Sequence, residues 1–74
     1  MGTTEVRFGK EVKRRRDACG FSQEELADRA QVHSSYISQM ERGVKSPTLG
    51  VICRLAKALK IQPSQLVGAL DDAD

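Results

Sequence analysis

The sequence predicts an all-α fold of five short helices around one small core. Apolar residues recur at helical spacing, and cap residues or helix-ending glycines separate the periodic segments. The clearest apolar stripe has the spacing of three, four and seven residues that one helix face requires, at Val51 or Ile52, Leu55, Ala56 and Leu59. No segment has the pattern of a strand, so the helices are expected to pack on one another.

The first helix is predicted over residues 5–19. Phe8 and Val12, four residues apart, lie on its inner face. The apolar pattern weakens after Val12, because Arg15 and Arg16 occupy positions where the stripe would continue. At least one of these arginines must therefore find a partner or extend its charged group to solvent.

The pattern of residues 22–43 predicts two short helices joined by a tight turn. Ser22 and Glu25 have the spacing of a capping box, in which the hydroxyl accepts a backbone N–H and the glutamate reaches back. The two helices are expected over residues 23–29 and 34–42. The second has small or polar residues at its outward positions, namely Ser34, Ser35, Ser38 and Gln39. This arrangement is typical of a helix-turn-helix.

The remaining landmarks place helix ends and two further helices. Gly20 and Gly43 are positioned to end the first and third helices, and Thr48 to cap the fourth. Pro63 suits the first turn of a fifth helix. That helix carries Leu66, Val67 and Leu70. Because one helix of a small domain rarely buries three such residues, we expect some of them to be exposed in a monomer.

Length and composition predict one globular domain over residues 1–74, with disordered tails at residues 1–4 and 71–74. Net charge is only +2, but six basic residues and two acidic ones fall within residues 5–16. A local basic patch of this kind suits a small DNA-binding protein. No apolar run approaches the ~18–20 residues that span a bilayer, and no secretory signal is evident, so a cytoplasmic protein is expected.

The two cysteines are expected to be free thiols, since a disulfide is rare in a reducing compartment. Cys53 is predicted to be a small core residue and Cys19 to lie at a helix end. His33 is the only histidine, so neither a metal site nor a cofactor is predicted. No nucleophile paired with a base, no paired carboxylates and no phosphate loop are visible, so the sequence does not predict an enzyme.

Further landmarks fall in one register along residues 8–70. They are Phe8-Gly9, Arg16, Gly20, Ser22-Gln23-Glu24-Glu25-Leu26-Ala27, Tyr36-Ile37-Ser38, Glu41-Arg42-Gly43, Pro47-Thr48-Leu49, Leu55-Ala56-Lys57-Ala58-Leu59 and Leu66. This pattern resembles the phage-repressor and Cro-like helix-turn-helix family, also called XRE-type. The resemblance implies a compact, lambda-repressor-like five-helix domain over about residues 5–70, a DNA-binding transcription regulator and usually a homodimer.

The resemblance also implies roles for individual residues. Base contacts are expected from Ser34, Ser35 and Gln39, with His33 and Ser38 beside them. Contacts with the sugar–phosphate backbone are expected from Gln23, which would also brace the recognition helix, and from Arg42 and Lys45. Helix starts and nearby side chains add further candidates for phosphate contact, namely Ser22, Thr48, Tyr36 and Arg14. Tyr36 equally suits simple packing of its ring. Arg16 and Glu41 match a buried ion pair between the first and third helices.

Three positions depart from the family pattern. Gln31 stands in the turn where glycine is common, and a left-handed glutamine costs roughly 1 kcal/mol. Arg15 replaces a frequent leucine, which leaves the packing under the first helix open. Gln62 replaces a better cap, so the fifth helix is expected to start loosely.

Gln39 is the best-equipped single reader, because a glutamine side chain can contact adenine N6 and N7 together. One recognition helix reads only a few base pairs. A two-fold dimer on a palindromic operator would double that number, with half-sites ~34 Å apart. The dimer interface is expected at the C-terminal region, through Leu66, Val67 and Leu70. With one glutamine and no arginine before Arg42, DNA shape is also expected to contribute to specificity.

The sequence is consistent with two more specific roles. The chain is similar in length to the controller proteins of restriction–modification systems, which are small members of the same class. An antitoxin that binds both operator DNA and a toxin is the other alternative, although residues 71–74 are short for a toxin-binding segment. A small-molecule ligand is not indicated by any motif.

Overall fold

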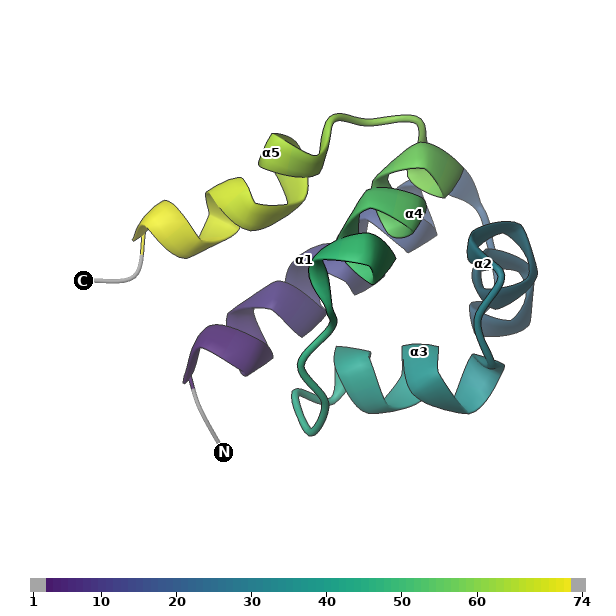
Figure 1. Ribbon diagram of the computed structural model, residues 1–74, viewed down its shortest axis with the longest axis horizontal. Coiled ribbons are helices and arrows are strands. Elements are labelled where there is room, and N and C mark those ends of the chain that lie inside the picture. The colour runs from purple at the N-terminus through teal and green to yellow at the C-terminus, as the bar shows by residue number, and fades with distance from the viewer. Residues whose placement is uncertain (1–2, 73–74) are drawn as a thin grey trace.

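The computed structural model describes residues 3–72, which form five α-helices and a terminal 3-10 helix (Figure 1). Their bounds are α1 Thr3–Cys19, α2 Gln23–Ala30, α3 Ser34–Glu41, α4 Leu49–Leu59, α5 Pro63–Val67 and η1 Gly68–Asp72. The all-α prediction is therefore confirmed. Within this part of the chain, no helix is long and apolar enough to cross a membrane.

The described helices extend into both of the tails that the sequence predicted. Thr3 and Thr4 belong to α1, and Asp71 and Asp72 belong to η1. The disorder expected for residues 1–4 and 71–74 stays a prediction at these four residues, which the helices include. The rest of that prediction, for residues 1–2 and 73–74, lies outside the described residues.

The first four helices end in the same way. Each is followed, directly or after one residue, by a residue with positive φ, and these residues are Gly20, Gln31, Gly43 and Lys60. After α2, for example, the N–H of Gln31 donates to Asp28 O at 3.2 Å and that of Val32 to Ala27 O at 2.9 Å. This paired closure is the Schellman motif, and it satisfies carbonyls that the helix leaves free. The expected left-handed glutamine is present, and Lys60 is a second non-glycine residue in that conformation.

The core draws side chains from all five α-helices. Its fully or nearly buried members include Phe8 and Val12 from α1 and Leu26 from α2. The others are Ala27, Ala30, Ile37, Met40, Val51, Leu55, Ala56, Leu59 and Leu66. The predicted stripe of α4 is thus confirmed, with Val51 rather than Ile52 as its first fully covered residue.

Cys53 is exposed, so the prediction that it is a core residue is wrong. It lies two residues after Val51 and two before Leu55, which places it on the opposite face of α4. Cys19 is the last residue of α1, as expected, and is also exposed and free.

The start of α5 is better closed than the sequence suggested. The side chain of Gln65 accepts a hydrogen bond from the backbone N–H of Gln62 at 2.8 Å. Pro63 is the first helical residue, as predicted. Gln65, inside the helix, therefore supplies the side-chain oxygen that caps the Gln62 N–H.

Helix α3 lies along one edge of the molecule, and α5 lies on the far side of α4 from it (Figure 1). Helix α2 packs against both α3 and α4, while α1 packs against α3. Helix α3 therefore packs on α1 and α2, which leaves its outward face free of both. This packing fixes where the polar residues of α3 point.

Candidate nucleic-acid interface

The outward face of α3 carries the residues predicted to read bases. Ser34 and Ser35 are exposed, whereas Ser38 and Gln39 are half-buried. The prediction that all four face fully outward is therefore too simple. Ser38 and Gln39 lie beside the buried residues Ile37 and Met40 in the eight-residue helix α3. Residues around α3 therefore cover part of the Ser38 and Gln39 side chains.

Two hollows share this face and meet at Ser35. One is lined by Val32, His33, Ser35, Tyr36, Gln39 and Lys45. The other is lined by Arg16, Ser22, Gln23, Glu24, Ser34, Ser35 and Ser38. The structure thus brings all five predicted base-contact residues, and four of the predicted phosphate-contact residues, onto one continuous surface.

The start of α3 leaves backbone donors open. His33 is its N-cap residue, and the His33 side chain makes no capping hydrogen bond. Free N–H groups at a helix start attract anionic groups such as phosphates. Ser34 and Ser35 follow directly, so hydroxyls and backbone donors lie together at this end of α3.

Capping at α2 follows half of the predicted box. The Ser22 hydroxyl accepts from the Glu25 N–H at 3.0 Å. The Glu25 carboxylate does not reach back to Ser22 in the described structure and instead lies 3.6 Å from the Arg29 guanidinium. The reciprocal half of the prediction is wrong, because an ion-pair partner one turn along the helix draws the carboxylate away.

The far end of α3 is held by a buried polar network. Arg16 Nε donates to Glu41 Oε2 at 2.8 Å, and Arg16 Nη2 donates to Glu41 Oε1 at 3.1 Å. Gln23 Nε2 donates to Glu41 Oε1 at 3.0 Å, which braces α3 from α2. Arg16 Nη1 donates to Phe21 O at 2.7 Å. Three elements therefore meet on one carboxylate, and the expected ion pair between α1 and α3 is present.

The hydrogen bonds that Arg16 donates to Glu41 raise the pKa of Arg16 above its ordinary value, while burial opposes that shift. Arg16 is therefore charged at every physiological pH. Its neighbour Arg15 is half-buried and donates to Glu11 Oε2 at 2.8 Å. Both arginines thus find partners, as the interrupted stripe of the first helix required.

Three predicted phosphate-contact residues lie outside the two hollows. Arg14 is on α1, where it donates to Glu11 Oε1 at 3.0 Å. The Thr48 hydroxyl accepts from the Val51 N–H at 3.2 Å and so caps α4. Arg42 is exposed and directly follows α3. Of the three, only Arg42 adjoins the outward face of α3 and has a charge that takes part in none of the described ion pairs.

A helix-turn-helix family model, HTH_3, matches residues 12–66, which is most of the chain. The chain belongs to the helix-turn-helix family. Control protein C.BamHI of Bacillus amyloliquefaciens is 39% identical to it over 61 residues, covering 81% of this chain and 75% of that protein.

Two solved structures resemble this helix-turn-helix domain closely. One is the restriction-modification controller protein C.AhdI from Aeromonas hydrophila, at 40% identity and a TM-score of 0.83, covering 84% of this chain and 94% of that one. The other is the biofilm regulator SinR in complex with DNA, at 30% identity and a TM-score of 0.78, covering 81% of this chain and 97% of that one.

The helix-turn-helix domain also carries an apolar surface away from α3. Leu66 was predicted at an interface, but it is 0% exposed and belongs to the core. Val67 and Leu70 are half-buried and line a small crevice with Phe8 and Ile52. The other residues of this crevice are Thr4, Glu5, Ser46 and Pro47.

Leu49, the first residue of α4, is 82% exposed. Sequence reasoning overlooked it as a contact candidate. The available signal was a leucine lying outside the buried stripe of its own helix. Its exposure makes it the most prominent apolar side chain on the described surface.

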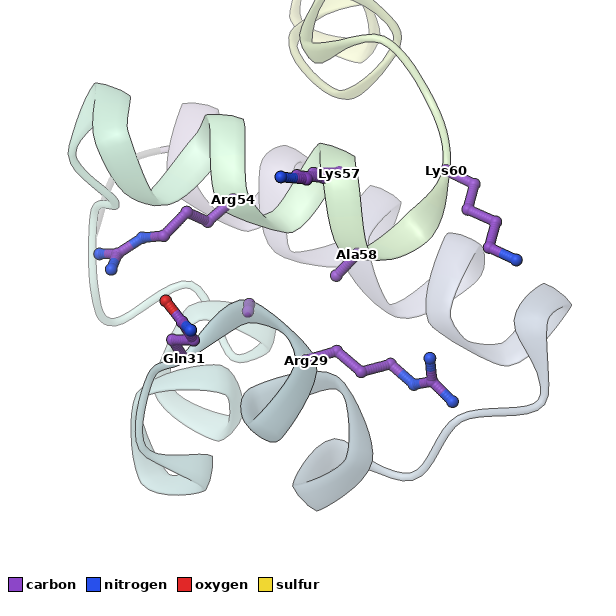
Figure 2. Close-up of a pocket in the computed structure, with 7 residues that line it drawn as sticks. Arg29, Gln31, Arg54, Lys57, Ala58 and Lys60 are labelled. Carbon is purple, nitrogen blue, oxygen red and sulfur yellow. The ribbon is translucent and has the colours of Figure 1, made fainter.

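A second basic surface of the helix-turn-helix domain has a structural explanation. Arg29, Arg54, Lys57 and Lys60 border a groove between α2 and α4. Figure 2 shows Arg29 and Lys60 extending to one side and Arg54 to the other, so the charges spread around the rim. The groove lies where α2 and α4 both end, and cations there offset the partial negative charge of helix C-termini.

Arg29 is further occupied by neighbours. Its guanidinium lies 4.4 Å from the centre of the Phe21 ring and 3.6 Å from Glu25. We therefore place no anion site in this groove. Among the described residues, no group of three or more His, Cys, Asp and Glu side chains is arranged to hold a metal ion.

Proposed function

We propose that this protein is a sequence-specific DNA-binding transcription regulator that inserts α3 into the major groove of an operator. The observation that carries this proposal is the shared polar surface of α2 and α3, where His33, Ser34, Ser35, Ser38 and Gln39 lie together. A rigid helix that presents donors and acceptors outward is what reading of base edges requires.

Within this proposal, Gln39 is the principal reader. Its amide can contact adenine N6 and N7 at once, whereas the serine hydroxyls make adaptable contacts of lower discrimination. The open N–H groups at the start of α3 add donors to the same surface. With few strongly discriminating side chains, sequence-dependent DNA shape supplies part of the specificity.

Backbone contacts flank the reader helix in this arrangement. Lys45 and Arg42 are exposed beyond its end and carry positive charge to a phosphate. Ser22, Gln23 and Tyr36 line the two hollows and supply neutral contacts. Arg14 is a weaker member of this set, since Glu11 already binds its guanidinium.

We further propose a homodimer on a palindromic operator. One α3 of eight residues contacts too few base pairs for a useful site, and a two-fold dimer places two such helices about 34 Å apart. The contact surface is the exposed Leu49 with the adjoining crevice of Ile52, Val67 and Leu70. This surface replaces the predicted one that included Leu66.

A controller role in a restriction–modification system is the more specific candidate. This role is supported by the similarity to C.BamHI and to C.AhdI. The match to C.AhdI covers 94% of the C.AhdI chain. In that role the protein would control a restriction–modification system. Placing the gene's own upstream region in a reporter assay tests this candidate.

Selection of bound fragments from random duplex DNA tests the main proposal. We expect enrichment of one inverted repeat whose half-sites lie one helical turn apart. Enrichment of a single unrepeated half-site would refute the dimer, and no enrichment at all would refute sequence-specific binding. Sedimentation should show dimers that Leu49→Asp converts to monomers, with Leu49→Met as the conservative control.

A further inference from the structure

Helices α1 and α3 approach closely at Gly9, in the middle of α1. Gly9 is buried, and a Cβ atom built there would lie 2.2 Å from Met40 O and 2.8 Å from Glu41 O. Both of these atoms are backbone atoms at the end of α3. Only a residue without a side chain therefore lets α1 rest directly on the recognition helix.

The same end of α3 is held at two further points. A Cβ at Gly43 would lie 2.7 Å from Val6 Cγ2, so the chain just after α3 also lies against α1. Glu41 is bound by Arg16 from α1 and by Gln23 from α2. At the other end, the cap residue His33 makes no side-chain hydrogen bond. The C-terminal end of α3 is therefore held by α1 and α2 together.

We propose that Gly9 is a positioning residue for DNA reading, which sets the height and tilt of α3 relative to the rest of the domain. This inference rests on the proposed DNA-binding function. A methyl group at position 9 cannot be accommodated by a side-chain rotation, because its neighbours are carbonyl oxygens. The end of α3 must instead move by about 1 Å to restore an ordinary contact.

Such a displacement is large compared with the tolerance of base reading. Binding groups must be held within about 0.5 Å of their productive positions. Gln39 directly precedes Met40, so its amide moves with the displaced carbonyl. Contacts with phosphates through Arg42 and Lys45 depend less on geometry, because long flexible cations can follow the backbone.

The test is the ratio of specific to non-specific affinity in Gly9→Ala. Affinities for the selected operator and for a random duplex are measured at one salt concentration. A loss of folded protein lowers both affinities equally and leaves the ratio unchanged. We expect the ratio to fall about tenfold. Gly50→Ala in α4 is the matched control, since the nearest atom to its Cβ is 3.9 Å away. A ratio within twofold of the original in Gly9→Ala would overturn the proposal.

Val6→Ala is a second variant, which tests the proposal if Gly9→Ala does not fold. This change removes the side-chain atoms against Gly43 without introducing a clash, and we expect the ratio to fall by about threefold. If Gly9→Ala is unfolded, an unchanged ratio in Val6→Ala overturns the proposal.

A measurement without DNA separates this inference from the proposed function. Outside the residues adjacent to the substitution, backbone amide chemical shifts in Gly9→Ala, or in Val6→Ala, should change most at residues 39–43 and least at the start of α3. Absence of any such change rejects the positioning role on structural grounds. Failure of the unchanged protein to prefer any DNA sequence rejects the proposed function, whatever the shifts show.

Discussion

Arg16 and Glu41 join two helices through a fork of hydrogen bonds across 25 positions of the chain. Their two contacts measure 2.8 and 3.1 Å, and the Glu41 side chain is only 4% exposed. Gln23 binds the same carboxylate. The recognition helix is therefore tied to α1 and α2 through one buried charge, whose removal has a predictable cost.

Replacing Arg16 with Met should destabilise the domain strongly. The substitution leaves the buried Glu41 carboxylate without its cation, and breaking a buried pair in this way costs about 3–5 kcal/mol. Urea denaturation measures the free energy of unfolding. The double variant Arg16→Met, Glu41→Leu should recover at least half of that loss, because no buried charge remains. Equal stability of the single variant and the original protein would contradict the prediction.

Gln39→Ala should weaken operator binding selectively. Loss of a two-point contact with one base costs about 1–3 kcal/mol of discrimination, while binding to random DNA depends on phosphates and should hardly change. Competition binding with both DNAs gives the two affinities. Ala58→Ser, in the groove between α2 and α4, serves as a control remote from α3. A similar loss of affinity for both DNAs would show that Gln39 does not read a base.

Lys45→Ala should lower affinity on every sequence by a similar factor. Each phosphate contact releases condensed counterions, so losing one should reduce the slope of log affinity against log salt by ~1. Lys13→Ala is the matched control, because Lys13 is paired with Asp17 on α1 at 3.3 Å. Titrations at four salt concentrations give the slopes. A slope identical to that of the original protein would exclude a phosphate contact at Lys45.

Gln31→Gly should stabilise the domain by roughly 0.5–1 kcal/mol. Gln31 has a φ of 61°, a conformation that costs a residue with a side chain but not glycine. Part of this gain is offset by the greater freedom of glycine in the unfolded chain. Thermal and urea unfolding measure the change. Gln62→Gly, where φ is −77°, should destabilise instead, so a shared direction for the two variants would refute the explanation.

Stability should fall in acid partly through Glu11. The hydrogen bond from Arg14 lowers the pKa of Glu11 below its ordinary value of 4.5, with Arg15 acting in the same direction and burial against it. The stabilisation is therefore present above pH 4.5 and is lost as the pH falls through the lowered pKa. Urea denaturation between pH 6 and 3 should show a shallower decline in Glu11→Gln. Glu24→Gln, at an exposed position of α2, should follow the original protein.

The amino-acid sequence by itself determined the helices and most of their ends. The stripe of α4, the caps at Ser22 and Thr48 and the stop at Gly43 depend on residues within one turn of each other. Local signals of this kind act through the backbone of a single segment, so they can be recognised without knowing what packs on it. The register of the helix-turn-helix followed from these same signals together with the family pattern.

Only the tertiary structure decided which faces its neighbours cover. Leu66 is buried, Leu49 is exposed and Cys53 points away from the core, although all three are apolar residues on helices. The close contact of Gly9 with the end of α3 likewise joins residues about 30 positions apart. Burial depends on how whole helices pack, and side-chain spacing within one helix does not specify its partner. The sequence therefore predicted which helix is the recognition helix, while packing between helices decided which contacts hold α3 in place.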